Sequence, residues 1–284
     1  MSNPTTASIK DQNKNEASSM FKRNVRKFMN NKLALFGLIV VVLITIACIV
    51  GFIMGVDYNT PMLPNMKKPP SGANLFGTDT IGRDLFARVL VGGCYSILIG
   101  VFCAVMSSVI GAILGAIAGY FGGKVDLLIM RAMDVLLAFP GILLSIVFVS
   151  VLGPNLDNAI LSVGIYTVPN FARMARGETL ALRNSEFIEA ARAMGSGDIR
   201  IVFSHILINI VSPMIVMGTL SFGTAIITTS GMGFLGIGAQ PPTPEWGAML
   251  SSGRQYLLVA PHVTTYTGLA ILFLVLGLNL LGDG

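Results

Sequence analysis

Two glycine-rich stretches have nearly the spacing of nucleotide-binding loops. The first, AGYFGGKV at residues 118–125, approaches the P-loop pattern G-x-x-x-x-G-K-[ST], in which backbone N–H groups cradle phosphates. However, Ala118 replaces the first glycine and Val125 replaces the Ser or Thr. The second, GMGFLG at residues 231–236, matches the dinucleotide pattern G-x-G-x-x-G but lies in an apolar run without a βαβ pattern. We expect no nucleotide site in either stretch.

Thiol and imidazole groups are few and scattered. The three cysteines, Cys48, Cys94 and Cys103, are odd in number and show no C-x-x-C spacing, which favours neither a disulfide framework nor a thiolate metal site. The two histidines, His205 and His262, are far apart in the sequence and neither lies near an acidic cluster. We therefore expect this chain to bind no metal and no other cofactor.

The composition indicates an integral membrane protein. Hydrophobic residues make up 53% of the 284 residues, charged residues only 12%, and the mean hydropathy is +0.75. A bilayer core about 30 Å thick requires about 20 mostly apolar residues in a helix. We therefore expect an all-α membrane protein with about six transmembrane helices, of which the fourth is the weakest. The charge-poor runs are residues 33–55, 95–120, 127–152, 158–172, 206–238 and 262–281.

The distribution of lysine and arginine gives the orientation. With six spans, 14 of the 19 basic residues fall on the side that holds both termini, and only five fall on the other side. The positive-inside rule therefore places the N- and C-termini in the cytoplasm. This topology accounts for the net charge of +5, so we expect no nucleic-acid partner.

The predicted spans divide the chain into four parts. Residues 1–32 form a cytoplasmic leader whose basic stretch, FKRNVRKFMNNK, predicts an amphipathic helix on the inner headgroups, with protein docking as the alternative. Residues 33–55 form the first span, which begins too far into the chain for a cleaved signal peptide. Residues 56–94 form an extracytoplasmic loop with an amphipathic segment. Residues 95–284 form a five-helix core that contains the cytoplasmic loop 173–205.

The centres of the predicted spans carry no charged residues. Ion-coupled transporters bury carboxylates, His or Lys at this depth as relays. Arg131 and Asp134, at the cytoplasmic end of the third span, are the nearest exception, and their i,i+3 spacing lets them neutralise one another on one helix face. We favour a structural pair over a direct part in transport. Transport against a gradient would therefore have to be powered by another subunit.

The inner loop contains a short polar segment, EFIEAARAMGSG, at residues 186–197. Ser185 can cap a helix there, Glu186 and Glu189 suit its first turn, and Gly195 suits the left-handed residue that ends it. We expect a helix over residues 186–194. Such a short helix is unstable alone in water, so it must pack either on its own membrane domain or on a cytoplasmic partner. Its narrow apolar face consists of Phe187, Ala190 or Ala191, and Met194.

Glycine and proline mark the second and third spans. Gly111, Gly115 and Gly119 repeat every fourth residue, a pattern that lets helix backbones approach closely. This face packs either within the subunit or against another chain. Pro140 should kink the third span, because it removes one backbone hydrogen bond and crowds the preceding turn. Such a kink suits a gate, although passive spans contain kinks too.

The segment EAARAMG, residues 189–195, resembles the loop with which inner-membrane permeases of ATP-binding cassette (ABC) importers dock in a cleft of their ATPase subunits. In that family the loop is a coupling helix. The family's following Ile-Leu-Pro reads Ile206, Leu207 and Ile208 here, so the proline is missing and the turn into the fifth span is left open. Glu189, Ala190, Ala191 and Gly195 match the loop residue by residue, and Phe187, Arg192 and Met194 lie in the same segment.

Further segments resemble the second permease of the dipeptide and oligopeptide group of this family. They are NKLALFGLIV, FGTDTIGRDLFARVLVGG, AGYFGGKVD, MRAMDVLLAFPGILL, FARMARGE, GFLGIGAQPPTPEWGAML and NLLGDG, and they extend across nearly the whole chain. Relatives normally continue with a short charged tail, which is here either naturally absent or abridged. The resemblance implies a type I ABC importer permease fold in the bacterial cytoplasmic (inner) membrane.

Two of these segments lie in the predicted outer loops. FGTDTIGRDLFARVL, residues 76–90, pairs Asp79 with Arg83 and Asp84 with Arg88 at i,i+4, so we expect an amphipathic helix on the outer membrane face. Structural anchoring is favoured there over substrate contact. QPPTPEWGAML, residues 240–250, should form a rigid outer cap. In it Trp246, the only tryptophan, is either an interfacial anchor or a contact for a substrate-delivering protein.

Hydroxyl side chains gather in the fifth span. Either they satisfy one another across packed helices, or they form a polar wall of the translocation path, which would suit the backbone amides of a peptide. The four residues are Thr224, Thr228, Thr229 and Ser230.

The resemblance also implies a division of labour. This chain would form a heterodimeric channel with a similar permease, two ABC ATPase subunits would bind ATP and Mg²⁺, and an extracytoplasmic binding protein would deliver the substrate. The chain itself would not be an enzyme. Small peptides are the expected substrate class, with glutathione or a nickel-type metal chelate as alternatives. An ATP-independent channel or a membrane scaffold is the alternative from another class.

Overall fold

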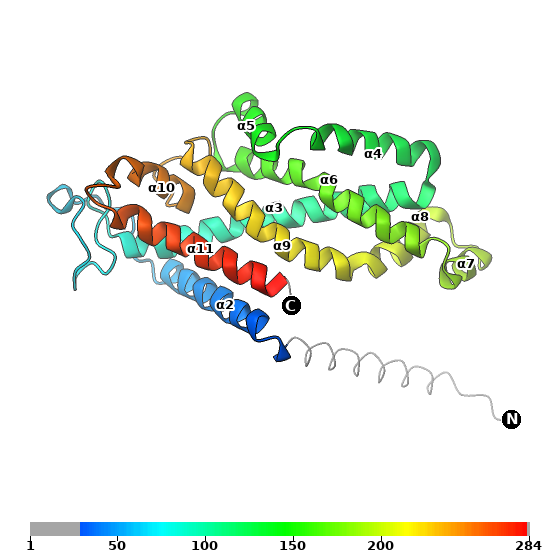
Figure 1. The fold of residues 1–284 in the computed structure, drawn as a ribbon, viewed down its shortest axis with the longest axis horizontal. Helices are drawn as coiled ribbons and strands as arrows, with labels where there is room; N and C mark the ends of the chain where they lie inside the picture. Colours follow the sequence, from blue (N-terminus) through cyan, green and yellow to red (C-terminus); the bar gives the residue numbers. More distant parts are fainter. Residues whose placement is uncertain (1–28, 283–284) are drawn as a thin grey trace.

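The computed structural model describes residues 29–282, and over that range the regular secondary structure is helical, as predicted, apart from one isolated bridge between Thr78 and Asp84 (Figure 1). The leader helix predicted within residues 1–32 lies almost wholly outside the described residues. The long helices are α2 (Lys32–Ile53), α3 (Leu85–Phe121), α4 (Gly123–Leu137), α5 (Gly141–Leu152), α6 (Leu156–Leu182), α9 (Leu207–Phe234) and α11 (His262–Gly282). The shorter ones are η1 (Leu63–Asn65), α7 (Glu186–Ala193), α8 (Asp198–Ile201), the π-helical turn η2 (Val202–Ile206), α10 (Trp246–Gly253) and η3 (Arg254–Tyr256).

Four helices in the described part of the chain are long and apolar enough to cross a bilayer: α2, α3, α11 and the continuous helix Asp198–Phe234. α4 and α5 together add a fifth candidate, but the two are bent by 90°. Pro140 occupies the cap position of α5, so the predicted kink is a full break between two helices. α6 holds the predicted fourth span and is 27 residues long, but its charged second half keeps it out of these candidates. A count of six spans stays a prediction.

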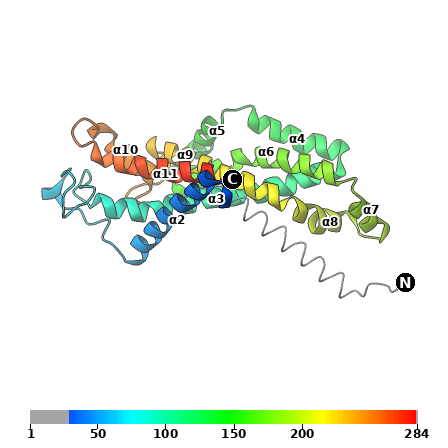
Figure 2. The same ribbon diagram turned by 60° about the horizontal axis from the view of Figure 1, so that its bottom comes forward.

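α3 and the continuous helix Asp198–Phe234 are the longest helices in the described structure, with 37 residues each, and α3 forms the axis of the bundle. The 37 residues of α3 extend about 55 Å at 1.5 Å per residue, whereas the hydrocarbon core of a bilayer is about 30 Å thick. Figures 1 and 2 show α6 and α9 beside α3, and all three extend past the C-terminal end of α11 toward α7 and α8. α10 and the loop before α3 lie at the opposite end. α3 is therefore longer than a span perpendicular to the bilayer requires.

The small-residue face of α3 packs on α6 within the same chain. A Cβ atom at Gly115 would lie 2.7 Å from the Ala175 Cβ, and one at Gly119 would lie 2.8 Å from the Thr179 Cβ. At Gly111 it would lie 2.9 Å from the backbone nitrogen of Ala172. These separations are too short for carbon contacts, so α3 and α6 approach this closely only because the three positions carry no side chain. Of the two predicted packing partners, the structure shows the one within the subunit.

Candidate coupling site

α7 lies at the end of the bundle that the charge distribution places in the cytoplasm, and it is one residue shorter than predicted. Ser185 is its N-cap residue, but the hydroxyl donates to the carbonyl oxygen of Leu182 at 2.6 Å, so the predicted side-chain cap is wrong. At the other end, Gly195 has a φ of +85°. The Ser196 N–H donates to the carbonyl oxygen of Ala191 at 3.0 Å, as in a Schellman motif. Gly195 thus ends the helix as predicted.

The two faces of α7 meet different surroundings. Ile188 is 0% exposed and Ala191 is 2% exposed. In contrast, Phe187 is 41% and Met194 is 81% exposed, and Ala190 is exposed as well. The sequence left open whether Ala190 or Ala191 lies on the apolar face between Phe187 and Met194. In the structure Ala190 lies on this exposed face, whereas Ala191 is buried. α7 therefore packs on its own membrane domain and still offers a narrow apolar face to a partner.

Ile188 belongs to a buried cluster that joins α7 to the long helices. An eight-residue helix gains its stability from packing of this kind. Ile188 was not singled out from the sequence, although it lies three residues before Ala191 on the same helix face, and that spacing is the signal that would have found it. The cluster, drawn from α3, α6, α7, α8, η2 and α9, consists of Ala116, Tyr120, Phe171, Ala175, Ile188, Ile201, Val202, Ile206, Ile210 and Met214.

Three polar side chains connect α7 to α3 and α8. The Tyr120 hydroxyl, in the last turn of α3, donates to Asp198 Oδ1 at 2.6 Å and accepts from Arg192 Nη2 at 3.2 Å. The Arg192 guanidinium also lies 5.9 Å from the centroid of the Tyr120 ring. The hydrogen bond to Tyr120 raises the pKa of Arg192 above its usual range. Arg192 therefore contacts its own chain, and neither Tyr120 nor Asp198 carries a sequence signal for this contact, because they are 78 residues apart.

The chain enters α9 through a bulge. Asp198–Phe234 is one continuous helix that contains the π-helical turn η2. A π-helical turn inserts an extra residue into a helix without ending it. η2 ends at Ile206, where the family's Ile-Leu-Pro would begin. The missing proline therefore leaves no gap in this structure, because the helix continues through the position that proline would have occupied.

The hydroxyl residues of α9 point in two directions. Thr229 and Ser230 are each only 5% exposed, which fits the alternative in which these hydroxyls lie between packed helices. Thr224 is exposed and Thr228 is half-buried, one turn apart on the same face. The Thr228 hydroxyl lies 3.2 Å from the hydroxyl of Tyr166 on α6. A Cβ atom at Gly141, beside the break at Pro140, would lie 2.5 Å from the Tyr166 ring.

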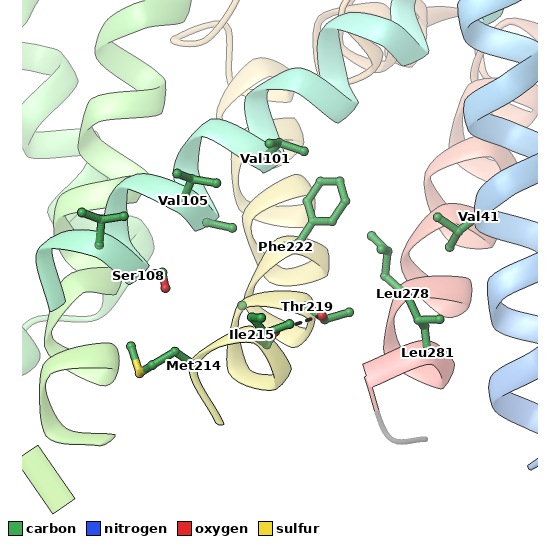
Figure 3. Close-up of a pocket in the computed structure, with 13 residues that line it drawn as sticks. Val41, Val101, Val105, Ser108, Met214, Ile215, Thr219, Phe222, Leu278 and Leu281 are labelled. Carbon is green, nitrogen blue, oxygen red and sulfur yellow. Dashed lines mark hydrogen bonds between the residues drawn. The ribbon is translucent and has the colours of Figure 1, made fainter. Parts of the chain in front are cut away.

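A cavity of about 510 Å³ opens between α2, α3, α9 and α11 (Figure 3). Figure 3 shows Val41 and Leu278 on one side of it, facing Val101 and Phe222 on the other. Its polar side chains are Ser108 and Thr219, and the Thr219 hydroxyl donates to the carbonyl oxygen of Ile215 at 3.0 Å. No charged side chain lines the cavity, so it offers nothing to the termini of a peptide. We do not assign a substrate site there.

Ion pairs hold α4 against α6 near the α7 end of the bundle. Arg173 donates to Asp134 at 2.7 Å, and Arg176 donates twice to Asp126. Arg131 lies 3.9 Å from Asp134, and 75% of its side chain is exposed. The prediction that Arg131 and Asp134 neutralise one another is therefore only partly right, because the principal partner of Asp134 lies on α6.

The outer segment around Asp79 is a folded loop, not the predicted amphipathic helix, and α3 begins only at Leu85. Asp79 is 5% exposed and pairs with Arg83 as predicted, at 2.6 Å. Arg88 also turns to Asp79, at 3.5 Å. Asp84 does not pair with Arg88 as predicted, because its carboxylate caps α3 by accepting from the Ala87 N–H at 2.7 Å. The buried contacts of Asp79 fit the structural anchoring that the sequence favoured.

The Trp246 side chain is buried within the described chain and does not reach its surface. It is 0% exposed, and its Nε1–H donates to the carbonyl oxygen of Val89 on α3 at 2.9 Å. The neighbouring Glu245 is 2% exposed and caps α10, accepting from the backbone N–H groups of Gly247 and Ala248 at 2.8 Å each. Burial raises the pKa of Glu245, against the lowering effect of these hydrogen bonds. Glu245 therefore caps α10, and Trp246 fixes α10 to α3.

Two family models match the chain. Residues 111–284 match the model described as binding-protein-dependent transport system inner membrane component. Residues 19–70 match the model of the N-terminal transmembrane domain of oligopeptide transport permease C. Together they cover α7, the α3–α6 packing face and the first span. They confirm the resemblance that the sequence motifs indicated.

Whole-chain relatives agree with these models. The chain is 42% identical to a dipeptide transport system permease of Alkalihalophilus pseudofirmus, over 94% of this chain and 88% of that protein. It is 46% identical to a glutathione transport system permease of Escherichia coli, over 96% and 90%. Among solved structures, the MetNI methionine ABC transporter in an inward-facing conformation has a similar fold, with a TM-score of 0.55 and 21% identity over 69% of this chain and 93% of that one. The chain therefore belongs to the family of binding-protein-dependent transport system inner membrane components, as a multi-pass permease of an ABC importer.

Proposed function

We propose that this permease pairs with a second, similar permease chain and imports small peptides. One of two ATPase subunits docks on α7 of this chain from the cytoplasm, the other docks on the second permease, and an extracytoplasmic binding protein delivers the substrate. ATP binding and hydrolysis in the ATPase subunits then switch the access of a cavity between the two permeases. This proposal goes beyond family membership in three points: the partners, the docking element and the substrate.

The observation that carries the docking proposal is the division of α7 into two faces. The buried face, with Ile188 and Ala191, fixes the helix to the cytoplasmic end of the bundle. The exposed face, with Phe187 and Met194, has no cover within the described chain. Ala190 lies between Phe187 and Met194 on this face, and its small side chain lets another surface approach the helix closely. An apolar helix face of this kind suits a groove on a partner. Glu186 and Glu189 add an exposed acidic edge.

We propose that ATP and Mg²⁺ bind only to the ATPase subunits and that this chain binds no cofactor of its own. The shape of the P-loop-like residues 118–125 supports this. They form the end of α3, two left-handed glycines and the start of α4, with φ of +64° at Gly122 and +53° at Gly123. A P-loop instead leads from a strand into a helix. The energy of hydrolysis must therefore reach this chain through a contact such as that on α7.

The relatives support a peptide as the substrate. Those named above are a dipeptide and a glutathione permease, and glutathione is itself a small peptide. The hydroxyls of exposed Thr224 and of half-buried Thr228, which lies beside Tyr166, could bond backbone amides without selecting among side chains. We place the translocation path along this face of α9. A metal chelate as the substrate, or a channel that works without ATP, would be recognised by the experiment below.

Charge reversal on α7 tests the docking proposal. In cells that carry the complete transporter, Glu189→Lys should abolish peptide uptake and separate the ATPase subunits from the membrane, while the permease still inserts. Gly195→Asp should do the same, because it places a negative charge at the C-terminal end of α7, where the helix dipole is unfavourable for an anion. The matched control is Glu178→Lys, the same reversal on α6 outside α7, which should leave uptake intact. Uptake that survives Glu189→Lys would refute docking through α7.

Substrate class is tested with the same transporter. A labelled dipeptide, glutathione and a nickel chelate are offered in parallel to cells with and without ATP depletion. ATP-dependent uptake of the dipeptide or of glutathione is the expected result. Uptake of the nickel chelate alone would move the substrate to the metal-chelate class, and uptake unaffected by ATP depletion would make the chain a channel.

A further inference from the structure

Tyr120 has a position that neither the family comparison nor the docking proposal explains. Its ring is 6% exposed within the buried cluster at the end of α3, while its hydroxyl reaches the rim of that cluster. There the hydroxyl accepts from Arg192 and donates to Asp198, so it uses both of its hydrogen-bonding roles. Both partners are charged, and such bonds are stronger than those between neutral groups.

The two partners lie on opposite sides of the turn between α7 and α8, whose backbone is held by the Schellman hydrogen bond from Ser196 to Ala191. Arg192 comes three residues before Gly195, and Asp198 comes three residues after it. Gly195 has a φ of +85°, and a Cβ atom at Gly195 or at Gly197 would meet no heavy atom within 4 Å. The turn between α7 and α8 is therefore open to solvent. One phenol bridges it from outside and fixes both flanking helices to α3.

The same end of α3 is also where the chain turns into α4. Gly122 and Gly123 follow Tyr120 directly after Phe121, and both are left-handed. Arg183, at the end of α6, reaches this turn, since a Cβ atom at Gly122 would lie 3.1 Å from its Nη1. Five helices, α3, α4, α6, α7 and α8, thus meet near Tyr120. A displacement of α7 passes to α3 through the buried contacts of Ile188 and, at this point, through the hydroxyl of Tyr120.

We propose that Tyr120 is the positioning residue of the coupling helix: through Arg192 and Asp198 it locks α7 and α8 to α3, so that a push on α7 moves α3. Without the hydroxyl, α7 rotates about Gly195 relative to α8, and its displacement moves α3 less. This inference rests on the proposed docking of ATPase subunits on α7. It adds that the permease itself determines how much of the ATPase movement becomes movement of the bundle.

Tyr120→Phe tests this, because it keeps the ring in the cluster and removes only the hydroxyl. In the complete reconstituted transporter, the number of substrate molecules imported per ATP hydrolysed should fall by about tenfold, the effect of losing a hydrogen bond to a charged group. Co-purification of the ATPase subunits and the thermal midpoint of the complex should stay as in the wild type. Tyr256→Phe, the same change at the outer end, is the matched control and should have the wild-type ratio.

A double-mutant cycle distinguishes loss of the hydrogen bond between Tyr120 and Asp198 from a nonspecific loss of stability. Asp198→Ala should also lower the number of substrate molecules imported per ATP, and the double variant should be no worse than Tyr120→Phe alone, because Tyr120→Phe already removes the bond to Asp198. Asp198→Asn retains an acceptor and should preserve the ratio. An unchanged ratio in Tyr120→Phe, or additive losses in the cycle, would overturn the proposal. If instead the docking proposal is wrong, Glu189→Lys leaves uptake intact, whatever Tyr120→Phe does.

Discussion

Arg176 on α6 donates two hydrogen bonds to the carboxylate of Asp126 on α4, from Nε at 2.5 Å and from Nη2 at 2.6 Å. The two helices have no tight chain connection, because α4 follows α3 across Gly122 and Gly123 and is separated from α6 by the whole of α5. This bidentate pair, together with Arg173 and Asp134, therefore sets the position of α4.

Removal of the carboxylate should loosen α4. Asp126→Ala is expected to lower the thermal midpoint of the purified permease, with a loss of about 1 kcal/mol because the pair is partly exposed. The control is Arg131→Ala, whose side chain is 75% exposed and 3.9 Å from Asp134, and it should leave the midpoint unchanged. Equal effects of the two variants in a thermal unfolding series would show that the bidentate geometry contributes nothing.

The close approach of α3 and α6 should fail when a side chain is added. Gly115→Val introduces carbon atoms where even a Cβ would lie 2.7 Å from the Ala175 Cβ, so we expect loss of several kcal/mol or loss of folded protein. Gly177 on α6 has no heavy atom within 4 Å of such a Cβ. Gly177→Ala should therefore be neutral or stabilise by up to about 1 kcal/mol through helix propensity. Expression level and thermal midpoint measure both, and a tolerated Gly115→Val would contradict the packing.

Gly195 should be required for its backbone conformation alone. A Cβ there meets open space, but the φ of +85° is unfavourable for most residues. Gly195→Ala should reduce uptake, whereas Gly195→Asn should retain more of it, because Asn tolerates left-handed φ better. Gly197→Ala, in the same turn but with a φ of −69°, is the control and should transport normally. If all three variants were equal in an uptake assay, the Schellman turn would have no importance for coupling.

Glu245 should make stability depend on pH. Burial raises its pKa in the folded state, so the folded protein favours the protonated carboxyl. For a carboxyl with a raised folded pKa, the stabilisation is complete below the unfolded value of about 4.5 and is lost as the pH rises through the folded pKa. Glu245→Gln carries no charge and still offers an acceptor to α10, so its thermal midpoint should change less over this window. Parallel curves for the variant and the wild type would refute this role.

The sequence predicted the all-α architecture well because hydrophobic length and lysine and arginine placement are local signals. The same is true of the C-terminal turn of α7, where Gly195 alone marks the left-handed residue. Contacts between distant segments were less accessible. Asp84 was expected to pair with Arg88, but its carboxylate accepts a hydrogen bond from the backbone N–H of Ala87 in the first turn of α3. Trp246 was expected outside, because composition does not reveal that Gly92 and Gly93 of α3 leave room for its ring.

The coupling site shows the same limit. Spacing identified the exposed face of α7, and it could also have identified Ile188. It could not identify Tyr120, since a tyrosine at the end of an apolar span has no signal that points to a residue 78 positions later. The division of Thr224 and Thr228 from Thr229 and Ser230 likewise depends on which neighbouring helix covers each face of α9. Periodicity defines faces, whereas tertiary packing decides which face is covered.

If α7 contacts a partner with one face and its own chain with the other, the adjacent residues Ala190 and Ala191 should differ in their contacts with the partner. In a transporter whose native cysteines are replaced by serine, single cysteines at Ala190 and at Ala191 are compared for crosslinking to the ATPase subunits with a short thiol–amine reagent. Ala190 is exposed and Ala191 is 2% exposed. We predict a crosslink from Ala190→Cys and none from Ala191→Cys. Crosslinks of equal yield from both, or from neither, would contradict the account.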